Sequence, residues 1–209
     1  MAETPTRSQR ADARRNVEAI LDAAVRVLAR DPDASVAVIA REAGVGRVTL
    51  YGHFQNRVAL LSAVVDRALN ETTAAITEAR LEEGEPFDAL ARLVVATWSV
   101  THRHGALVVA AQRSLPQDAL TSVHAAPMAA AETLFERGQR SGVFRDDISA
   151  AWLVALLHNV THGASTAVHD GQLDAVEAPR LILATMAGTV TPPGTPVPSA
   201  LDHAVGGVS

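Results

Sequence analysis

The chain has 209 residues, of which 48% are apolar, with a formal net charge of −5 and no cysteine. This length suits one medium domain or two small ones with a substantial core. Disulfides, thiolate metal sites and a cysteine nucleophile are excluded, and no run approaches the ~18 apolar residues of a membrane span. The N-terminus lacks the apolar core of a signal peptide, so a cytoplasmic protein without a membrane partner is expected.

The charges are unevenly distributed along the chain. Residues 1–57 hold nine arginines against seven acidic residues, whereas the remainder holds nine against sixteen, and lysine is absent. A mildly basic head on an acidic body favours an anionic partner at the head.

The predicted elements of the head are short helices. Residues 1–13 are polar and are expected to form a flexible basic arm. A first helix then ends near Pro32, because proline disfavours helix in the residue before it. Ser35 is expected to cap a second helix that ends at Gly44. A third helix covers Arg47–Gly52, and Asn56 caps a long fourth one. The apolar face of the first helix is formed by Val17, Ile20, Leu21, Ala24 and Leu28.

The rest of the chain also predicts helices, and an all-α fold is expected because no stretch shows strand alternation. After a break at Gly84 and Pro86, a helix is expected to end near Gly105, followed by a short segment 106–113. Further helices are predicted from about Pro127 to Arg140, over 150–168 with Asp147 or Ser149 as cap, and over 177–189. The tail 191–209 is rich in proline and glycine and is expected to be unstructured.

Residues 36–53 read as two helices joined by a tight turn. Ala40 lies where the helices would cross, Gly44 permits a positive φ in the turn, and Ile39, Val45 and Leu50 are inward apolar positions. This is the pattern of a helix-turn-helix, whose second helix lies in the DNA major groove. An ordinary helical hairpin is the alternative on these positions alone.

The third helix would present an unusual set of side chains to solvent. Leu50 and Phe54, four residues apart, are expected to face the core. The outer side chains are then Arg47, Val48, Thr49, Tyr51 and His53. Arginine can bond guanine, valine and the threonine methyl can contact thymine methyls, and tyrosine and histidine can donate to phosphates. Arg57 would add a phosphate contact at the start of the fourth helix.

The segment "SVAVIAREAGVGRVTLYGHFQNRVALLSAV" resembles the DNA-binding region of the TetR family of bacterial repressors, and the resemblance covers about residues 14–65. It implies an all-helical homodimer with a DNA-binding domain at 14–57 and a helical regulatory and dimerisation domain at 58–190. Carried over by position, base contacts fall on Arg47, Val48 and Thr49. Phosphate contacts fall on Tyr51, His53 and Arg57. Members often have lysine and glutamate where this chain has Arg57 and Val58, so a favourable carboxylate near the helix N-terminus is missing.

The N-terminal arm carries Arg7, Arg10, Arg14 and Arg15. It is either a solvated basic tail or a flexible arm that adds phosphate or minor-groove contacts, as homeodomain arms do.

The helices at 150–168 and 177–189 are apolar nearly all round, which requires neighbours on every side. A partner subunit can supply the missing neighbours, so we expect two helices from each of two subunits to form a four-helix interface. A fully intramolecular core is the alternative.

A small, mostly apolar effector is expected to bind between helices of residues 86–168. The candidate ligand-binding residues are Trp98, His102, Gln112, Met128, Phe135, His158, Asn159 and His162. His158 and His162 have a spacing that suits metal, but "HNVTH" lacks the glutamate of a zinc metalloprotease. His102 and His104 would diverge on a helix. No metal and no cofactor are expected.

The sequence predicts a regulator rather than an enzyme. It contains no G-x-S-x-G, no phosphate-binding glycine loop and no H-E-x-x-H motif. A dimeric repressor, released from a palindromic operator in double-stranded DNA by a small molecule, is expected. The alternatives are a non-specific architectural DNA binder, a ligand-binding helical protein with a degenerate head, and a transcriptional activator of the same family.

Overall fold

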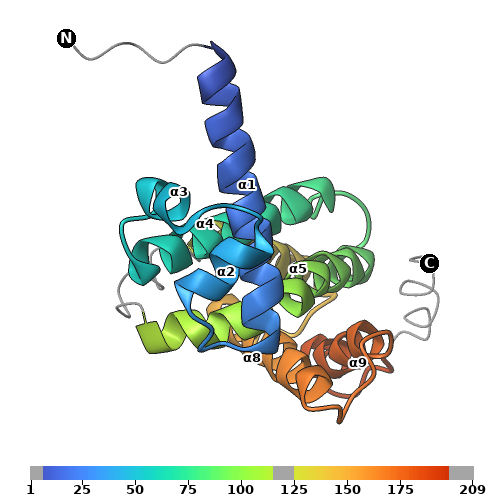
Figure 1. Ribbon diagram of the computed structural model, residues 1–209. Coiled ribbons are helices and arrows are strands. Elements are labelled where there is room, and N and C mark those ends of the chain that lie inside the picture. The colour runs from blue at the N-terminus through green and yellow to red at the C-terminus, as the bar shows by residue number, and fades with distance from the viewer. Residues whose placement is uncertain (1–6, 115–124, 198–209) are drawn as a thin grey trace. The chain divides into compact units, whose positions relative to one another are not determined.

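The computed structural model describes residues 7–114 and 125–197, with side chains described for 11–104 and 127–197. Within these ranges the chain is helical, with no strand, which confirms the expected fold class (Figure 1). The helices are α1 (Arg7–Arg30), α2 (Val36–Glu42), α3 (Arg47–His53), α4 (Arg57–Glu78), α5 (Pro86–Ser114), α7 (Ala125–Arg140), α8 (Ala150–His169) and α9 (Ala178–Val190).

The described residues fall into two compact units. One is drawn from Met1–Arg67 and Ala106–Leu120, and the other from Ala68–Gly105 and Thr121–Ser209. Helix α4 therefore contributes its first turns to one unit and its last turns to the other.

The first unit is a helical head built on one apolar face from each helix. Helix α1 contributes a stripe at helical spacing, and the short α2 and α3 add a few buried side chains each. The first turns of α4 complete the core. Its buried side chains include Ile20, Leu21, Ala24, Leu28, Ile39, Ala40, Leu50, Phe54, Leu60, Leu61 and Val64. This agrees with the apolar spacing of the sequence.

The turn between α2 and α3 is set by Gly44. Its φ is +68°, a conformation that side chains other than glycine rarely adopt. The Gly44 N–H donates to the Arg41 carbonyl at 3.1 Å, and the Val45 N–H donates to the Ala40 carbonyl at 3.0 Å. These two bonds form a Schellman motif, which ends α2 and redirects the chain into α3.

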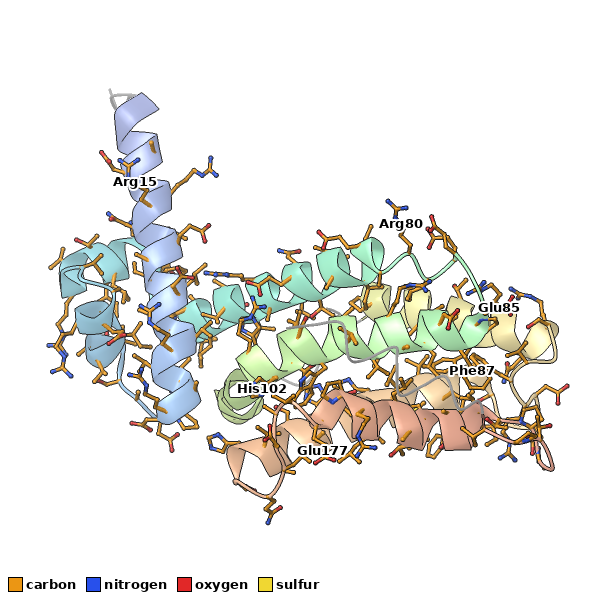
Figure 2. The ribbon with its side chains drawn as sticks, turned by 90° about the vertical axis from the view of Figure 1, so that its right-hand side faces the viewer. Arg15, Arg80, Glu85, Phe87, His102 and Glu177 are labelled. Atoms are coloured by element: carbon orange, nitrogen blue, oxygen red, sulfur yellow. The ribbon has the colours of Figure 1, made fainter. Side chains whose placement is uncertain are left out.

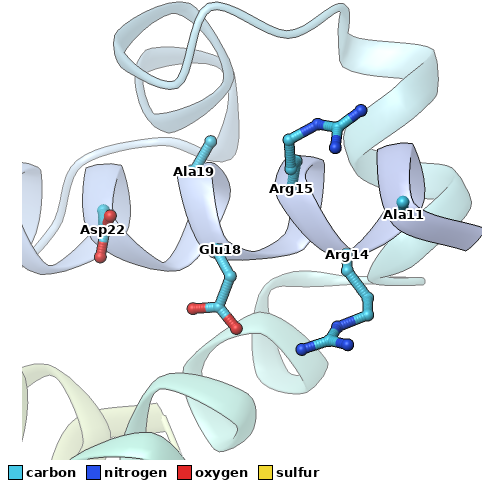
Figure 3. A pocket seen from close by; sticks show the side chains of 6 residues that line it. All are labelled: Ala11, Arg14, Arg15, Glu18, Ala19 and Asp22. Carbon is cyan, nitrogen blue, oxygen red and sulfur yellow. The ribbon is translucent and has the colours of Figure 1, made fainter.

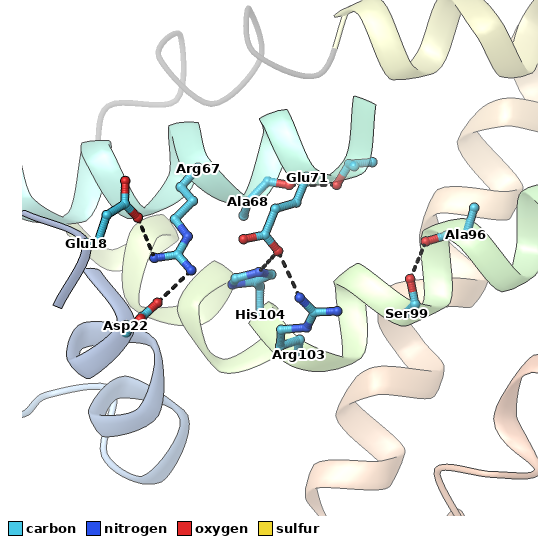
Figure 4. Close-up of polar contacts among 10 residues, drawn as sticks. Glu18, Asp22, Arg67, Ala68, Glu71, Ala96, Ser99, Arg103 and His104 are labelled. Atoms are coloured by element: carbon cyan, nitrogen blue, oxygen red, sulfur yellow. Dashed lines mark hydrogen bonds and ion pairs between the residues drawn. The ribbon is translucent and has the colours of Figure 1, made fainter. Parts of the chain in front are cut away.

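Ion pairs join α1 to its neighbours in the head. Arg26 Nε donates to Glu42 Oε1 on α2 at 3.2 Å. On α4, Arg67 lies 2.6 Å from the Asp22 carboxylate and 3.6 Å from that of Glu18 (Figure 4). Because the Arg67 side chain is only 28% exposed, these pairs fix the register of α1 against α4 better than a surface pair does.

The second unit has a larger apolar core formed by α5, α7, α8 and α9. Three phenylalanines cluster within it: Phe87 meets Phe144 edge-on at 5.1 Å between ring centroids, and Phe135 lies 6.1 Å from Phe144. Gly138 lies against the Phe144 ring, where an added Cβ would come within 2.0 Å of a ring carbon. Figure 2 shows Phe87 near the start of α5 and His102 toward its far end.

Two arginines hold the turn between α4 and α5. Arg92 donates to the carbonyls of Ala79, Arg80 and Glu83, at 2.7, 3.0 and 2.6 Å. Arg137 on α7 donates to the carbonyls of Leu81 and Gly84, both at 2.8 Å. The turn carbonyls, which no helix satisfies, thus receive charged donors.

Several capping predictions are confirmed. The Ala59 N–H donates to Asn56 Oδ1 at 2.9 Å, and the Trp152 N–H donates to Ser149 Oγ at 3.3 Å. Ser35 occupies the N-cap of α2, but its side chain makes no capping bond. Gly142 follows α7 with a φ of +72°.

Two helix bounds differ from the expectation. Helix α1 begins at Arg7 rather than near residue 14, because arginine, glutamine and alanine are good helix formers that extend a helix already nucleated by packing. Helix α5 continues through Gly105 to Ser114. One glycine costs about 1 kcal/mol in a helix, which the following run of alanine, leucine and valine offsets. Residues 1–6 and 198–209, with parts of the predicted arm and tail, lie outside the described residues.

None of the described helices is both long enough and apolar enough to cross a membrane.

Candidate nucleic-acid interface

Helix α3 is held by one side chain and leaves the rest of its surface open. Leu50 is fully buried and is the only buried residue of the helix. Gly46 precedes the helix in an extended conformation, and the Phe54 N–H closes it by donating to the Leu50 carbonyl at 2.8 Å. Leu50 and Phe54 therefore point inward, as the sequence predicts.

The outward side chains of α3 form a mixed apolar and hydrogen-bonding surface. Val48 is 88% exposed and Tyr51 49% exposed, Arg47 and Thr49 are exposed, and His53 is half-buried. The Arg47 side chain forms no ion pair or hydrogen bond with another described residue. An exposed valine beside a free guanidinium, a hydroxyl and a phenol provides groups that can contact base edges and phosphates.

Arg57 has a role that the sequence did not suggest. Its guanidinium donates to the carbonyl of Ala34 and, at 2.7 Å, to the carbonyl of Pro32, both in the turn between α1 and α2. Arginine has five N–H donors, so some remain, but the side chain is directed to the turn. Its predicted phosphate contact stays a prediction, beside an observed role in joining α4 to this turn.

The predicted ligand-binding residues form two local pairs. The Trp98 and His102 rings stack with centroids 5.1 Å apart, and those of His158 and His162 lie 4.3 Å apart. Trp98 is buried, whereas His102 is exposed. Each pair lies on one helix, at a spacing of four residues.

The other predicted ligand-binding residues are separately placed. Phe135 is fully buried in the core and Met128 packs against it. Asn159 is exposed and donates to the Ala155 carbonyl of its own helix at 2.8 Å. Gln112 belongs to α5, but its side chain lies outside the described residues.

Sequence reasoning missed a buried polar group on α5. The His104 side chain is 4% exposed, and its Nε2 lies 3.0 Å from Glu71 Oε2 (Figure 4). Arg103 Nη1 donates to the same oxygen at 3.2 Å. His102 and His104 diverge, as expected. The signal was available: His104 lies one helical turn beyond the apolar Val100, which is also buried, on a helix that was expected to end near Gly105.

Three buried polar atoms among the described residues of the second unit have no hydrogen-bond partner. They are Nε of Arg137, Nδ1 of His104 and Oγ1 of Thr161 on α8, and Thr161 is 3% exposed. A buried group left unpaired costs about 1–3 kcal/mol. Among the described residues, no group of three or more potential metal ligands is found.

Helices α8 and α9 expose large apolar side chains. Trp152 is 62% exposed and Leu181 is 37% exposed. Gly163 and Gly188, also exposed, have nothing within 4 Å of an added Cβ. We call the exposed side chains of α8 and α9, including these four residues, the α8–α9 face.

Among comparisons with known proteins, the family match lies in the head. Residues 20–64 match the family described as bacterial regulatory proteins, tetR family. An 81-residue segment is 43% identical to the HTH-type transcriptional repressor LfrR of Mycolicibacterium smegmatis, which is 39% of this chain and 42% of LfrR. The chain is also 28% identical over 158 residues to the HTH-type transcriptional regulator NfxB of Pseudomonas aeruginosa, covering 74% of this chain and 83% of NfxB.

Solved structures extend the likeness to both units. The crystal structure of the TetR-like regulator LfrR from Mycobacterium smegmatis in complex with proflavine has a TM-score of 0.68 at 25% identity, covering 86% of this chain and 99% of that one. The regulator FadR of Bacillus subtilis in complex with stearoyl-CoA has a TM-score of 0.69 at 20% identity, covering 83% and 98%. The second likeness concerns the fold alone.

Proposed function

Since this chain belongs to the TetR family of bacterial regulatory proteins, we propose that it is a dimeric transcriptional repressor that a small molecule releases from a palindromic operator. In this role the chain acts in the cytoplasm, binds double-stranded DNA and an effector, and catalyses no reaction.

The exposed face of α3 is the observation that carries the proposal. A helix anchored by Leu50 alone leaves Arg47, Val48 and Thr49 free to enter a major groove, with Arg47 unpaired among the described residues. Tyr51 and His53 follow on the same short helix and suit phosphate contacts, which fix the register of a reading helix. Arg57 supports the head by holding the turn between α1 and α2.

The α8–α9 face supports the dimer. The tryptophan on α8 and the leucine on α9 are large apolar side chains exposed on adjacent helices, and such exposure marks protein interfaces. The exposed glycines Gly163 and Gly188 would let helices of a second copy approach closely. Asn159 is exposed on α8 as well, one turn from Leu156 and Gly163, so it suits this interface better than a ligand pocket.

The effector site is proposed in the second unit, around α5 and α8. Trp98 is buried there, and the Ser165 hydroxyl on α8 donates to the Thr101 carbonyl on α5 at 3.5 Å. The unpaired atoms of His104 and Thr161 would gain a partner from a bound molecule. These groups suit a mostly apolar compound with one or two hydrogen-bonding groups.

The test of DNA reading is selection of bound duplexes from a random pool. We expect a palindrome with half-sites one helical turn, ~34–36 Å, apart. A folded protein that enriches no motif would contradict the proposal. Equal retention of scrambled duplexes would indicate an architectural DNA binder instead.

The effector can be sought through tryptophan fluorescence. The chain has two tryptophans, of which Trp98 is buried and Trp152 exposed. In the Trp152→Phe variant, emission reports on Trp98 alone. An effector should change this emission and lower operator affinity; a 100-fold decrease corresponds to about 2.7 kcal/mol of coupling. Compounds that bind near Trp98 without any effect on DNA affinity would contradict release by an effector.

A further inference from the structure

An open hollow on α1 does not indicate any class of ligand. It is lined by two arginines, two acidic residues and two alanines: Ala11, Arg14, Arg15, Glu18, Ala19 and Asp22 (Figure 3). Arg15 pairs with Asp12. Glu18 and Asp22 both lie near the Arg67 guanidinium on α4. Because charges of both signs line this hollow and most of them are paired within the head, it favours neither an anion nor a cation.

A buried imidazole on α5 gives a clearer indication. His104 is 4% exposed, and its Nε2 lies 3.0 Å from Glu71 Oε2 on α4 (Figure 4). An ionised carboxylate only accepts hydrogen bonds, so the proton in this contact belongs to Nε2. Arg103 donates to the same oxygen at 3.2 Å and already brings a positive charge to it. These contacts suit a neutral imidazole whose Nδ1 has a lone pair and accepts a hydrogen bond.

This Nδ1 atom is buried and has no hydrogen-bond partner among the described residues. Buried polar groups without a partner are rare in folded proteins, and each lowers stability. The unpaired Oγ1 of Thr161 on α8 is less selective, because a hydroxyl both donates and accepts. Of these two atoms, only His104 Nδ1 therefore distinguishes a ligand that donates a hydrogen bond from one that accepts it.

The part of α5 that carries His104 is otherwise apolar and adjoins α8. Val100, one turn before His104, is 5% exposed, and Trp98 is 7% exposed. The carbonyl of Thr101 accepts from the Ser165 hydroxyl on α8 at 3.5 Å. A compound bound here would meet apolar side chains and few polar atoms, so one hydrogen bond contributes strongly to the choice of compound.

We propose that His104 Nδ1 anchors the effector and selects compounds that present a hydrogen-bond donor to it, such as a hydroxyl, phenol or N–H group, over compounds that present a carboxylate. This inference rests on the proposed function. A donor would complete the hydrogen bonding of the imidazole. An ionised carboxylate has no donor, so it would meet the lone pair of Nδ1 and the nearby negative charge of Glu71.

The first part of the test needs no ligand. Nitrogen–proton correlation spectra of protein with isotope-labelled histidine distinguish protonated from unprotonated ring nitrogens. The His104 signals are identified by their loss in the His104→Gln variant. We expect a protonated Nε2 and an unprotonated Nδ1 at neutral pH. A protonated Nδ1 would overturn the inference, because the ring would then favour a ligand that accepts.

The second part adds three probes that share one ring system: naphthol, which has a donor, methoxynaphthalene, which has none, and naphthoate, which is a carboxylate. Affinities are measured by calorimetry for the wild-type protein and for His104→Gln. The glutamine amide can keep the donation to Glu71, but it has no acceptor in place of Nδ1. His169→Gln is the matched control, because His169 is an exposed histidine at the end of α8.

Naphthol should shift the Nδ1 signal and bind the wild-type protein roughly three- to tenfold more tightly than His104→Gln, as expected for one hydrogen bond. Methoxynaphthalene should bind both proteins equally, naphthoate should bind the wild type more weakly than naphthol does, and the control should behave as the wild type. Thermal midpoints verify that each variant is folded.

Equal affinity of naphthol for the wild type and His104→Gln would overturn the inference, and so would tighter binding of naphthoate than of naphthol. An Nδ1 signal that no probe shifts would also overturn it, since a buried water would then be the partner of this atom. Any of these results, together with a selected palindrome, leaves the proposed function standing. If no DNA motif is selected but naphthol binds as expected, the proposed function is contradicted and the donor preference of His104 stands.

Discussion

The exposed faces of α3 and of α8–α9 both break the usual rule that large apolar side chains are buried, but they do so differently. On α3, Val48 and Tyr51 are interspersed with Arg47 and Thr49. On the α8–α9 face, Trp152 follows the exposed Ala151 and Leu181 lies one turn before the exposed Ala184, while the charged Glu177 and Arg180 lie at the N-terminal end of α9.

The anchoring of the two regions differs as well. Helix α3 has seven residues and one buried side chain, whereas α8 has twenty residues and six buried ones. A short helix that presents guanidinium, hydroxyl and methyl groups suits the DNA major groove, where base edges offer hydrogen-bonding groups and methyl groups. A long, firmly packed helix with small and large apolar groups suits a complementary apolar surface. Exposed hydrophobic residues therefore indicate a partner, and their neighbours indicate its chemistry.

The largest effect is expected from Trp152→Glu on the α8–α9 face. A carboxylate buried in an apolar interface without a partner is strongly unfavourable, so the dimer dissociation constant should rise at least 100-fold. Light scattering should show a monomer, and circular dichroism should show retained helix because Trp152 is 62% exposed in the protomer. A dimer of wild-type strength would show that the α8–α9 face is not the interface.

Gly138→Ala tests the packing of the core of the second unit and leaves the side chains of both exposed faces unchanged. The new methyl group would lie 2.0 Å from the Phe144 ring, so the ring and its neighbours must shift. Overpacking of this kind costs roughly 1–3 kcal/mol. Urea unfolding should show this decrease in stability. The nearby Gly142→Ala variant cannot serve as a matched control, because Gly142 has a positive φ and alanine would be strained there. An unchanged free energy of unfolding would mean that the Phe144 ring and its neighbours can move aside for the methyl group without loss of stability.

Arg57→Gln tests whether the α3 surface depends on the turn that Arg57 holds. Removal of two charged donors leaves the Ala34 and Pro32 carbonyls without these partners, which should lower the stability of the head by about 1–2 kcal/mol. Hydrogen exchange should increase in α2 and α3. If affinity falls with a reduced salt slope and exchange is unchanged, Arg57 acts on phosphate, as the sequence suggested.

The smallest effect is expected from Gly163→Ala, made in the monomeric Trp152→Glu background. An added Cβ meets nothing within 4 Å, and alanine is favoured over glycine in a helix by about 1 kcal/mol. The monomer should therefore become more stable in urea, while the same change in the wild-type dimer should weaken association. A destabilised monomer would show that Gly163 has an intramolecular neighbour.

The helix-turn-helix was predictable from sequence because its determinants are local. Gly44, Leu50 and Phe54 lie within eleven residues, and each acts through neighbours on the same or the adjoining helix. The position of Asn56 as a cap was predictable for the same reason.

Long-range contacts were not predictable. Arg57 finds its acceptors in a turn 23 and 25 residues away, and no pattern in the sequence signals that pairing. The buried position of His104 was not predictable because Gly105 favours a helix end, although α5 continues through this one glycine. The ligand-binding candidates depend on how α5, α7 and α8 pack, which periodicity alone does not determine.

The most direct test of sequence reading by α3 is selection from a random DNA pool with the wild-type protein and Arg47→Gln in parallel. Arginine favours guanine and glutamine favours adenine in the major groove. The account predicts one palindrome for the wild type, and for the variant the same palindrome changed at one symmetric pair of positions. Identical motifs would contradict base contact by Arg47, and no motif from either folded protein would contradict DNA reading by this head.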